Sequence, residues 1–262
     1  MAKVVSAAFI GGGRVARILL EGWKVAGYEP ARVVVVEPDE EALHLLRQVG
    51  PEITTAESGD VSDCELVFLA VHPPAMQEAM KSIAGKLAPQ AVVVSLVPKI
   101  QCATIAEALG TEQVVRMIPN APSAIGKGFN PVFFSAGIVP ETKQELHALF
   151  APWGEHPDVE EADLEAYAVI SAMGPTYFWY QVQALRDLGV SFGLDPQATD
   201  EAVSKMLEGA VDCLLAKGPE SMDLIPVRPL QELEPTVKEA YDSKLKGVFG
   251  KLTMSNPDSL RG

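Results

Sequence analysis

The stretch that decides how this chain folds is residues 10–16, Ile-Gly-Gly-Gly-Arg-Val-Ala. An apolar run at residues 4–10 leads into it, and residues 15–23 follow with apolar side chains at helical spacing. Gly11 allows a tight turn, Gly13 lets the backbone approach a bound group, and Ala16 lets the helix pack closely on the strand. The stretch therefore predicts a strand, a glycine turn and a helix whose N-terminus can bind the diphosphate of a dinucleotide.

Short runs rich in valine recur after this unit. They occupy residues 33–36, 66–71, 91–97 and 114–118, and a helix-like stretch at residues 39–48 separates the first two. Apolar runs that do not alternate with polar residues suit strands buried on both faces, as in a parallel sheet covered by helices. We therefore expect an α/β protein with an N-terminal Rossmann domain, a doubly wound parallel sheet.

The character of the sequence changes near residue 155. An acidic stretch begins there, and beyond it the β-rich runs stop and helical patterns continue to about residue 252. The acidic residues are Glu155, Asp158, Glu160, Glu161, Asp163 and Glu165. We expect a dinucleotide-binding domain at residues 1–160 and an all-helical domain at residues 161–262.

Composition excludes several classes of partner. The formal charge of −14 is unsuited to nucleic acid or to an anionic membrane surface, and no apolar run approaches the roughly 20 residues that span a bilayer. Three widely spaced cysteines argue against a disulfide framework and against a metal site. We expect a cytoplasmic protein that binds a small-molecule substrate and no metal.

An acidic residue, Glu37, ends the second predicted strand. A carboxylate there can accept hydrogen bonds from both adenosine ribose hydroxyls, which favours NAD(H). The 2′-phosphate of NADP(H) would instead meet a like charge, at a cost of about 4 kcal/mol per unit charge at about 4 Å before screening. We therefore expect NAD(H) to be favoured over NADP(H), although Arg32 or Arg47 could still accommodate the phosphate.

Four stretches resemble the pyrroline-5-carboxylate reductase family. They are FIGGGRVA at residues 9–16, FLAVHP at 68–73, VRMIPNAP at 115–122 and ISAMGPTY at 170–177. The family usually has Asn-Met in place of Arg14-Val15, and a lysine in place of His72. The resemblance to the family's Arg-x-Met-Pro-Asn-Thr-Pro segment at residues 115–122 is the most specific of the four.

The resemblance implies a helical dimerisation domain, a homodimer or higher homo-oligomer, and a role in proline biosynthesis. The implied reaction is hydride transfer from NAD(P)H to the C=N bond of a small cyclic imino acid. The glycine motif and the resemblance together give these cofactor-binding candidates: Gly11, Gly13, Arg14, Val15, Glu37, Ala70, Val71, His72, Asn120 and Pro122.

One family feature is missing from this chain. The family carries a Ser-Pro-Gly-Gly-Thr-Thr loop that holds the substrate carboxylate, but the corresponding residues 224–231 read LIPVRPLQ. Either Arg228 replaces the loop as an ion-pairing fork, which makes it our substrate-binding candidate, or the natural substrate is not pyrroline-5-carboxylate. Arg228 between two prolines also fits a rigid surface loop.

The helical segment expected to face the nicotinamide offers only hydroxyls as proton donors. Residues 164–190 contain no His and no Lys, and we select Ser171 and Thr176, beside the Gly174-Pro175 break, as catalytic candidates. Reduction of a carbonyl needs a positioned proton donor, whereas a protonated imine carries its own charge, so this inventory favours C=N reduction. Two alternatives stay open: a dinucleotide-binding protein without turnover, and a dehydrogenase acting on a carbonyl or hydroxy acid.

Overall fold

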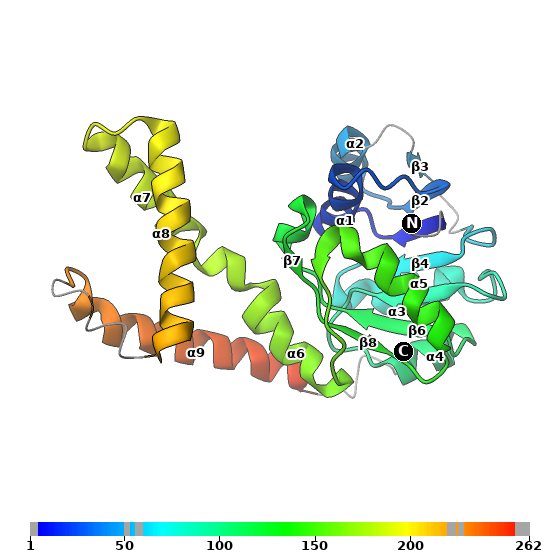
Figure 1. Ribbon diagram of the computed structural model, residues 1–262. Coiled ribbons are helices and arrows are strands. Elements are labelled where there is room, and N and C mark those ends of the chain that lie inside the picture. The colour runs from blue at the N-terminus through cyan, green and yellow to red at the C-terminus, as the bar shows by residue number, and fades with distance from the viewer. Residues whose placement is uncertain (1–4, 50–52, 56–59, 219–223, 225–227, 255–262) are drawn as a thin grey trace. The chain divides into compact units, whose positions relative to one another are not determined.

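The computed structural model describes residues 5–49, 53–55, 60–218, 224 and 228–254. They form two compact units, one up to residue 173 together with the residues from 248, the other spanning residues 174–247. The first unit is an α/β sandwich and the second is helical (Figure 1). The predicted fold class, a Rossmann sheet followed by a helical domain, is confirmed.

A seven-stranded sheet forms the centre of the first unit, in the order β3-β2-β1-β4-β5-β6-β8. All neighbouring strands are parallel except β6 and β8. The strands are β1 (Ser6–Ile10), β2 (Arg32–Val36), β3 (Ile53–Thr55), β4 (Leu66–Leu69), β5 (Val92–Ser95), β6 (Val114–Met117) and β8 (Val132–Phe134), with a separate pair β7 (Gly128–Phe129) and β9 (Gly154–Glu155). Because the strand order reverses direction at β1, a crevice forms between the carboxyl ends of β1 and β4, where such sheets bind ligands.

Helices cover both faces of this sheet, as the unbroken valine runs require. Ala7 and Phe9 of β1 pack on one face with residues of α1 (Arg14–Val25), α2 (Glu40–Val49) and α5 (Pro140–Phe150). Ala8 and Ile10 pack on the other face with α3 (Met76–Ile83) and α4 (Cys102–Leu109). Successive side chains of a strand therefore point to opposite faces of the sheet and pack in different hydrophobic cores.

A buried aromatic cluster fixes α1 against the sheet. Trp23 of α1 stacks on Trp153 with ring centroids 5.0 Å apart, and Trp153 Nε1 donates to the carbonyl of Leu19 at 2.7 Å. Phe68 of β4 makes edge contacts with both tryptophans. The indole N–H groups are thus satisfied within the core, and the N-terminus of α1 is held at the crevice.

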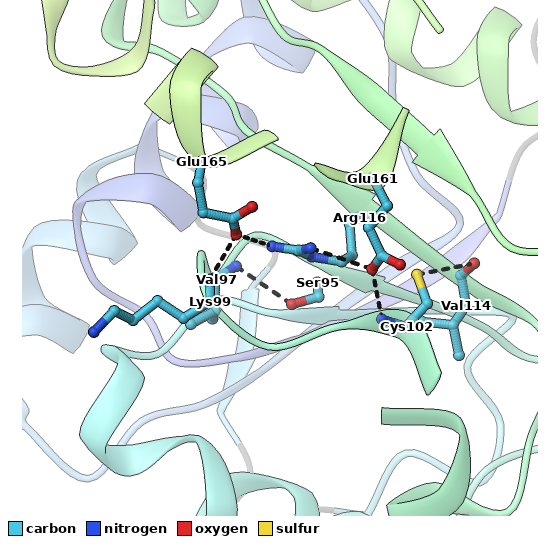
Figure 2. Close-up of polar contacts among 8 residues, drawn as sticks. All are labelled: Ser95, Val97, Lys99, Cys102, Val114, Arg116, Glu161 and Glu165. Atoms are coloured by element: carbon cyan, nitrogen blue, oxygen red, sulfur yellow. Dashed lines mark hydrogen bonds and ion pairs between the residues drawn. The ribbon is translucent and has the colours of Figure 1, made fainter. Parts of the chain in front are cut away.

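A buried ion-pair cluster ties the sheet to the segment that follows it (Figure 2). Arg116 of β6 is 1% exposed, and its Nη2 lies 2.6 Å from Oε1 of Glu165 in α6 (Leu164–Tyr167). Its Nη1 lies 3.2 Å from Oε1 of Glu161 in the preceding 3₁₀ turn. These ion pairs attach Glu161 and Glu165 to the sheet, and residues 161–173 belong to the first unit. The domain boundary expected between residues 160 and 161 stays a prediction.

Cys102 adjoins this cluster, because its backbone N–H donates to Glu161 Oε1 at 2.7 Å. Burial, and next the charge of Glu161, raise the pKa of the Cys102 thiol to about 12. The thiol is therefore neutral at pH 7 and a poor nucleophile.

Three helices make up most of the second unit: α7 (Trp179–Ser191), α8 (Pro196–Lys217) and α9 (Glu234–Thr253), whose last turn belongs to the first unit. Asp195 caps α8 by accepting hydrogen bonds from the N–H groups of Gln197 and Ala198. Helices α7 and α8 meet where Gly189 faces Thr199, with no room for a Cβ on the glycine. None of the helices described in either unit is both long and apolar enough to cross a membrane.

Large apolar side chains of α7 and α8 lie exposed in this unit. They are Trp179, Tyr180, Leu185, Leu188, Val190, Met206, Val211, Leu214 and Leu215. A helix pair with so much uncovered apolar surface is typical of one half of a subunit interface.

Removing the Arg116 charge should destabilise the fold. The Arg116→Met variant leaves two carboxylates without their buried counter-ion, so we expect the free energy of unfolding to fall by about 3 kcal/mol in urea denaturation. Arg186→Met, which breaks an exposed ion pair with Asp200, is the matched control and should cost clearly less. Equal losses in the two variants would contradict a stabilising role for the buried cluster.

Candidate functional site

The glycine turn after β1 has a geometry that only glycine adopts without strain. Gly11 has φ +101°, and a Cβ on it would lie 2.7 Å from the carbonyl oxygen of Ala70. Its N–H donates to the carbonyl of Val36 at 2.9 Å, and the N–H of Ala70 donates to Ile10 at 2.8 Å. The carboxyl ends of β2, β1 and β4 are therefore drawn together at this turn.

The space beyond the N-terminus of α1 is open at Gly13. It occupies the N-cap position without a side-chain cap, and a Cβ built on it would meet no atom within 4 Å. No acidic residue lies in the first turn of α1, whose first residue is the exposed Arg14. Free N–H groups, the positive end of the helix dipole and an arginine together suit a diphosphate.

Glu37 is held in place at the end of β2 by the backbone. One carboxylate oxygen accepts a hydrogen bond from Gly12 N at 2.8 Å, and the other accepts one from Asp39 N at 2.9 Å. The carboxylate is therefore anchored beside the glycine turn, where an adenosine ribose would lie if the diphosphate sat at Gly13.

A cleft of about 780 Å³ opens along these elements. Eight of the predicted cofactor-binding residues line it: Gly11, Gly13, Arg14, Val15, Glu37, Ala70, Val71 and His72. The volume and the polar rim fit a dinucleotide. That these residues bind the cofactor stays a prediction, but the structure brings all eight to one cleft.

Sequence reasoning missed the residues of α2 and α3 that line the cleft. Ala75, Glu78, Ala79 and Ser82, from α3 and the turn before it, line it together with Glu40, Leu43 and Arg47 of α2. Their membership depends on how α2 and α3 pack beside the sheet, and no local motif marks it. The side chains of Arg14 and Arg47 make no hydrogen bond or ion pair with any residue that the structure describes, and both line the cleft.

Asn120 and Pro122 do not line this cleft. Asn120 is 8% exposed: its Nδ2 donates to the carbonyl of Ser171, and its Oδ1 accepts from Phe129 N, both at 3.2 Å. Pro122 lies in the 3₁₀ turn Ala121–Ile125, which packs on α1. The Asn120 amide thus joins the loop after β6 to the helical segment, and contact of either residue with a nicotinamide stays a prediction.

The catalytic candidates lie in different units. Ser171 belongs to the first unit, in the π-helix Ala168–Ala172, and its Oγ donates to the carbonyl of Tyr167 at 2.9 Å. While its proton is used in this bond, the Ser171 oxygen can accept a hydrogen bond, for example from the N–H of an imine or amine. Thr176 is exposed in the 3₁₀ turn Gly174–Tyr177 of the second unit.

Arg228, the substrate-binding candidate, is exposed in the second unit, and its carbonyl accepts a hydrogen bond from Gln231 N at 3.1 Å. The neighbouring residues 225–227, in the segment that corresponds to the family's carboxylate loop, lie outside the described residues. The roles of Arg228, Ser171 and Thr176 stay predictions.

Two family models match the chain. Residues 6–99 match the model described as NADP oxidoreductase, coenzyme F420-dependent, and residues 161–226 match the model described as pyrroline-5-carboxylate reductase dimerisation. The two matches fall on the sheet unit with its cleft and on the segment that leads into and includes the helix pair.

Similar folds occur among solved structures. A pyrroline carboxylate reductase from Plasmodium falciparum, with NADP bound, covers 96% of this chain and 98% of its own with a TM-score of 0.78 at 18% identity. A 1-pyrroline-5-carboxylate reductase from Streptococcus pyogenes covers 95% and 98% with a TM-score of 0.75 at 19% identity. At these identities the likeness shows the fold alone.

Sequence relatives give the family. A pyrroline-5-carboxylate reductase from Corynebacterium melassecola is 29% identical over 259 residues, 96% of each chain. One from Mycobacterium tuberculosis (strain CDC 1551 / Oshkosh) is 30% identical over 218 residues, 80% of this chain and 74% of the relative. The resemblance inferred from the four motifs is confirmed: this chain belongs to the pyrroline-5-carboxylate reductase family.

Proposed function

We propose that this protein is an NAD(P)H-dependent oxidoreductase that reduces the C=N bond of a small cyclic imino acid, as its relatives' name indicates. The observation that carries the proposal is the cleft at the β1–β4 crevice, with Gly13 open to a diphosphate and Glu37 anchored beside it. Membership of the family supports the substrate class, pyrroline-5-carboxylate or a related imine, and a role in proline biosynthesis.

The main task of the protein's own residues is to position the cofactor and the substrate. When bound, the reduced nicotinamide supplies a hydride to the imine carbon, and the nitrogen of the protonated imine takes up the electron pair to become a neutral amine. The protein holds the dinucleotide at Gly13, Arg14 and Glu37 and brings the two reactants together. The absence of His and Lys from residues 164–190 suits an imine that arrives already protonated.

We also propose a homodimer or higher homo-oligomer in the cytoplasm. The exposed apolar surface of α7 and α8 supports association with a second copy, and the match to a dimerisation family model agrees with it. Three free cysteines, two of them buried, suit a reducing compartment.

A coupled binding and turnover assay tests the proposed function. We expect NADH to bind, as followed by its fluorescence, and to be oxidised when pyrroline-5-carboxylate is added, with slower oxidation by keto acids. Binding without turnover on a panel of imines and keto acids would favour the non-catalytic alternative, and turnover of keto acids alone would favour a carbonyl dehydrogenase.

Two glycine substitutions separate ligand binding from folding. Gly13→Ala places a methyl group in open space, so we expect an unchanged thermal midpoint for the free protein but a dissociation constant for NADH raised about tenfold or more, because the diphosphate loses close backbone contact. Gly11→Ala would instead collide with Ala70 and should lower the midpoint itself. Unchanged NADH affinity in Gly13→Ala would remove the diphosphate from this turn.

Glu37 should set the preference for NADH over NADPH. Glu37→Gln keeps the shape but removes the charge that repels a 2′-phosphate, so we expect the ratio of NADPH to NADH dissociation constants to fall about tenfold or more. Glu40→Gln, at another acidic residue lining the same cleft, is the control and should change the ratio little. Tighter binding of NADPH than of NADH by the unaltered protein would refute the preference.

A further inference from the structure

Lys99, just after β5, has a backbone conformation that side chains rarely adopt. Its φ is +79°, and it is the sole non-glycine residue with positive φ in the described part of the chain. A lysine gains nothing locally from this conformation, since its Cβ crowds the backbone there. Such a conformation persists when the surroundings impose it, and it is often found where a side chain is aimed at a ligand.

Two carboxylates bracket the turn that contains Lys99. Its N–H donates to Glu165 Oε1 at 2.9 Å, and three residues later the N–H of Cys102 donates to Glu161 Oε1 at 2.7 Å. The guanidinium of Arg116 lies between the two carboxylates and pairs with both (Figure 2). The same buried cluster that joins the sheet to α6 therefore fixes the backbone at both ends of residues 99–102.

The Lys99 side chain takes no part in this cluster. It is exposed, and its ammonium group makes no hydrogen bond or ion pair with any residue in the described ranges. Figure 2 shows the side chain extending away from the two carboxylates. The charge of Arg116 is neutralised by its neighbours, whereas the charge of Lys99 is available to a ligand.

The strand register puts Lys99 on the edge of the sheet that carries the cleft. Leu69 of β4 pairs with Ser95 of β5, and Ser95 pairs with Arg116 of β6. The chain therefore leaves these three strands at the same level, and the next few residues include His72, Lys99 and Asn120 respectively. Lys99 emerges between the turn that lines the cleft and the loop that carries Asn120.

A dinucleotide in the cleft would present its reactive end on this side. Glu37 at β2 suits the adenosine and Gly13 beside β1 suits the diphosphate, so the nicotinamide would lie beyond β4, on the side of β5 and β6. A substrate that receives a hydride must lie against the nicotinamide, and Lys99 follows the strand β5 on that side of the sheet.

We propose that Lys99 binds the carboxylate of the imino acid substrate, with Glu165 as the positioning residue that holds its backbone. The proposal rests on the proposed function and deepens it. It supplies a cation for the substrate in a chain that lacks the family's Ser-Pro-Gly-Gly-Thr-Thr loop. An ammonium group paired with a carboxylate gives a charge-assisted hydrogen bond, which supports both affinity and orientation.

The test compares substrates with and without the carboxylate. The full-length protein, saturated with NADH, is assayed with pyrroline-5-carboxylate and with 1-pyrroline, the same ring lacking the carboxylate. For Lys99→Met we expect KM for the carboxylate substrate to rise about tenfold or more, and KM for 1-pyrroline and the NADH dissociation constant to stay within about twofold. Lys99→Arg, which keeps the charge, should retain most of the affinity.

Two further variants distinguish carboxylate binding by Lys99 from a loss of local structure and from carboxylate binding by Arg228. Lys99→Gly removes the charge and the backbone strain together, so it should show the same selective loss with a thermal midpoint no lower than that of the unaltered protein. Arg228→Met tests the competing expectation for Arg228: if Lys99 holds the carboxylate in its place, the carboxylate selectivity of this variant is unchanged. The proposal is overturned if Lys99→Met affects both substrates equally or neither, or if the selective loss appears in Arg228→Met instead.

The same assay distinguishes failure of the proposed function from failure of the proposal for Lys99. If the unaltered protein reduces neither imine, the proposed reaction is wrong, and the role of Lys99 is then decided by equilibrium binding in the presence of NAD⁺. A thermal stabilisation by proline, absent with pyrrolidine and lost in Lys99→Met, supports a carboxylate site at Lys99. No stabilisation by proline, or the same stabilisation in both proteins, overturns it.

Discussion

The close approach of two backbones at Gly11 is the constraint on which the first unit depends. The carbonyl of Ala70 occupies the space that a Cβ would need, and hydrogen bonds from the same turn reach β2 and β4. A larger residue would push β4 away from β1, and the crevice between the two strands is the cleft itself. The turn also sets where α1 begins, so the geometry of three strand ends and one helix terminus follows from a single missing side chain.

Arg116 and the cations near the cleft differ in what their charges can do. Arg116 is buried, and two carboxylates neutralise it, so it acts on the structure alone. The side chains of Arg14 and Arg47 line the cleft and that of Lys99 is exposed after β5, and none of the three forms an ion pair with a described residue. In a chain with a formal charge of −14, cations beside the cleft favour the approach of anionic ligands to it.

Much of the fold could be predicted because its signals are local. The run expected at residues 33–36 lies in β2, and the helical stretch at residues 15–23 lies in α1, since valine runs and helical periodicity are readable within one segment. The short strands β3 and β8 were not predicted, because few residues contribute and pairing with a neighbour decides them. The eight predicted residues that line the cleft follow from motifs. The contribution of α3 and the Lys99 turn depend instead on contacts between segments far apart in sequence, such as that of Lys99 with Glu165.

The three tryptophans offer built-in fluorophores with contrasting surroundings. Trp23 of α1 and Trp153 are stacked in the interior of the first unit, whereas Trp179 is 56% exposed at the start of α7. Indole emission shifts to longer wavelength in water. The emission at short wavelength therefore reports whether the sheet unit is folded, and the emission at long wavelength reports whether α7 is covered. One optical measurement on the unlabelled protein therefore follows folding and association as separate signals.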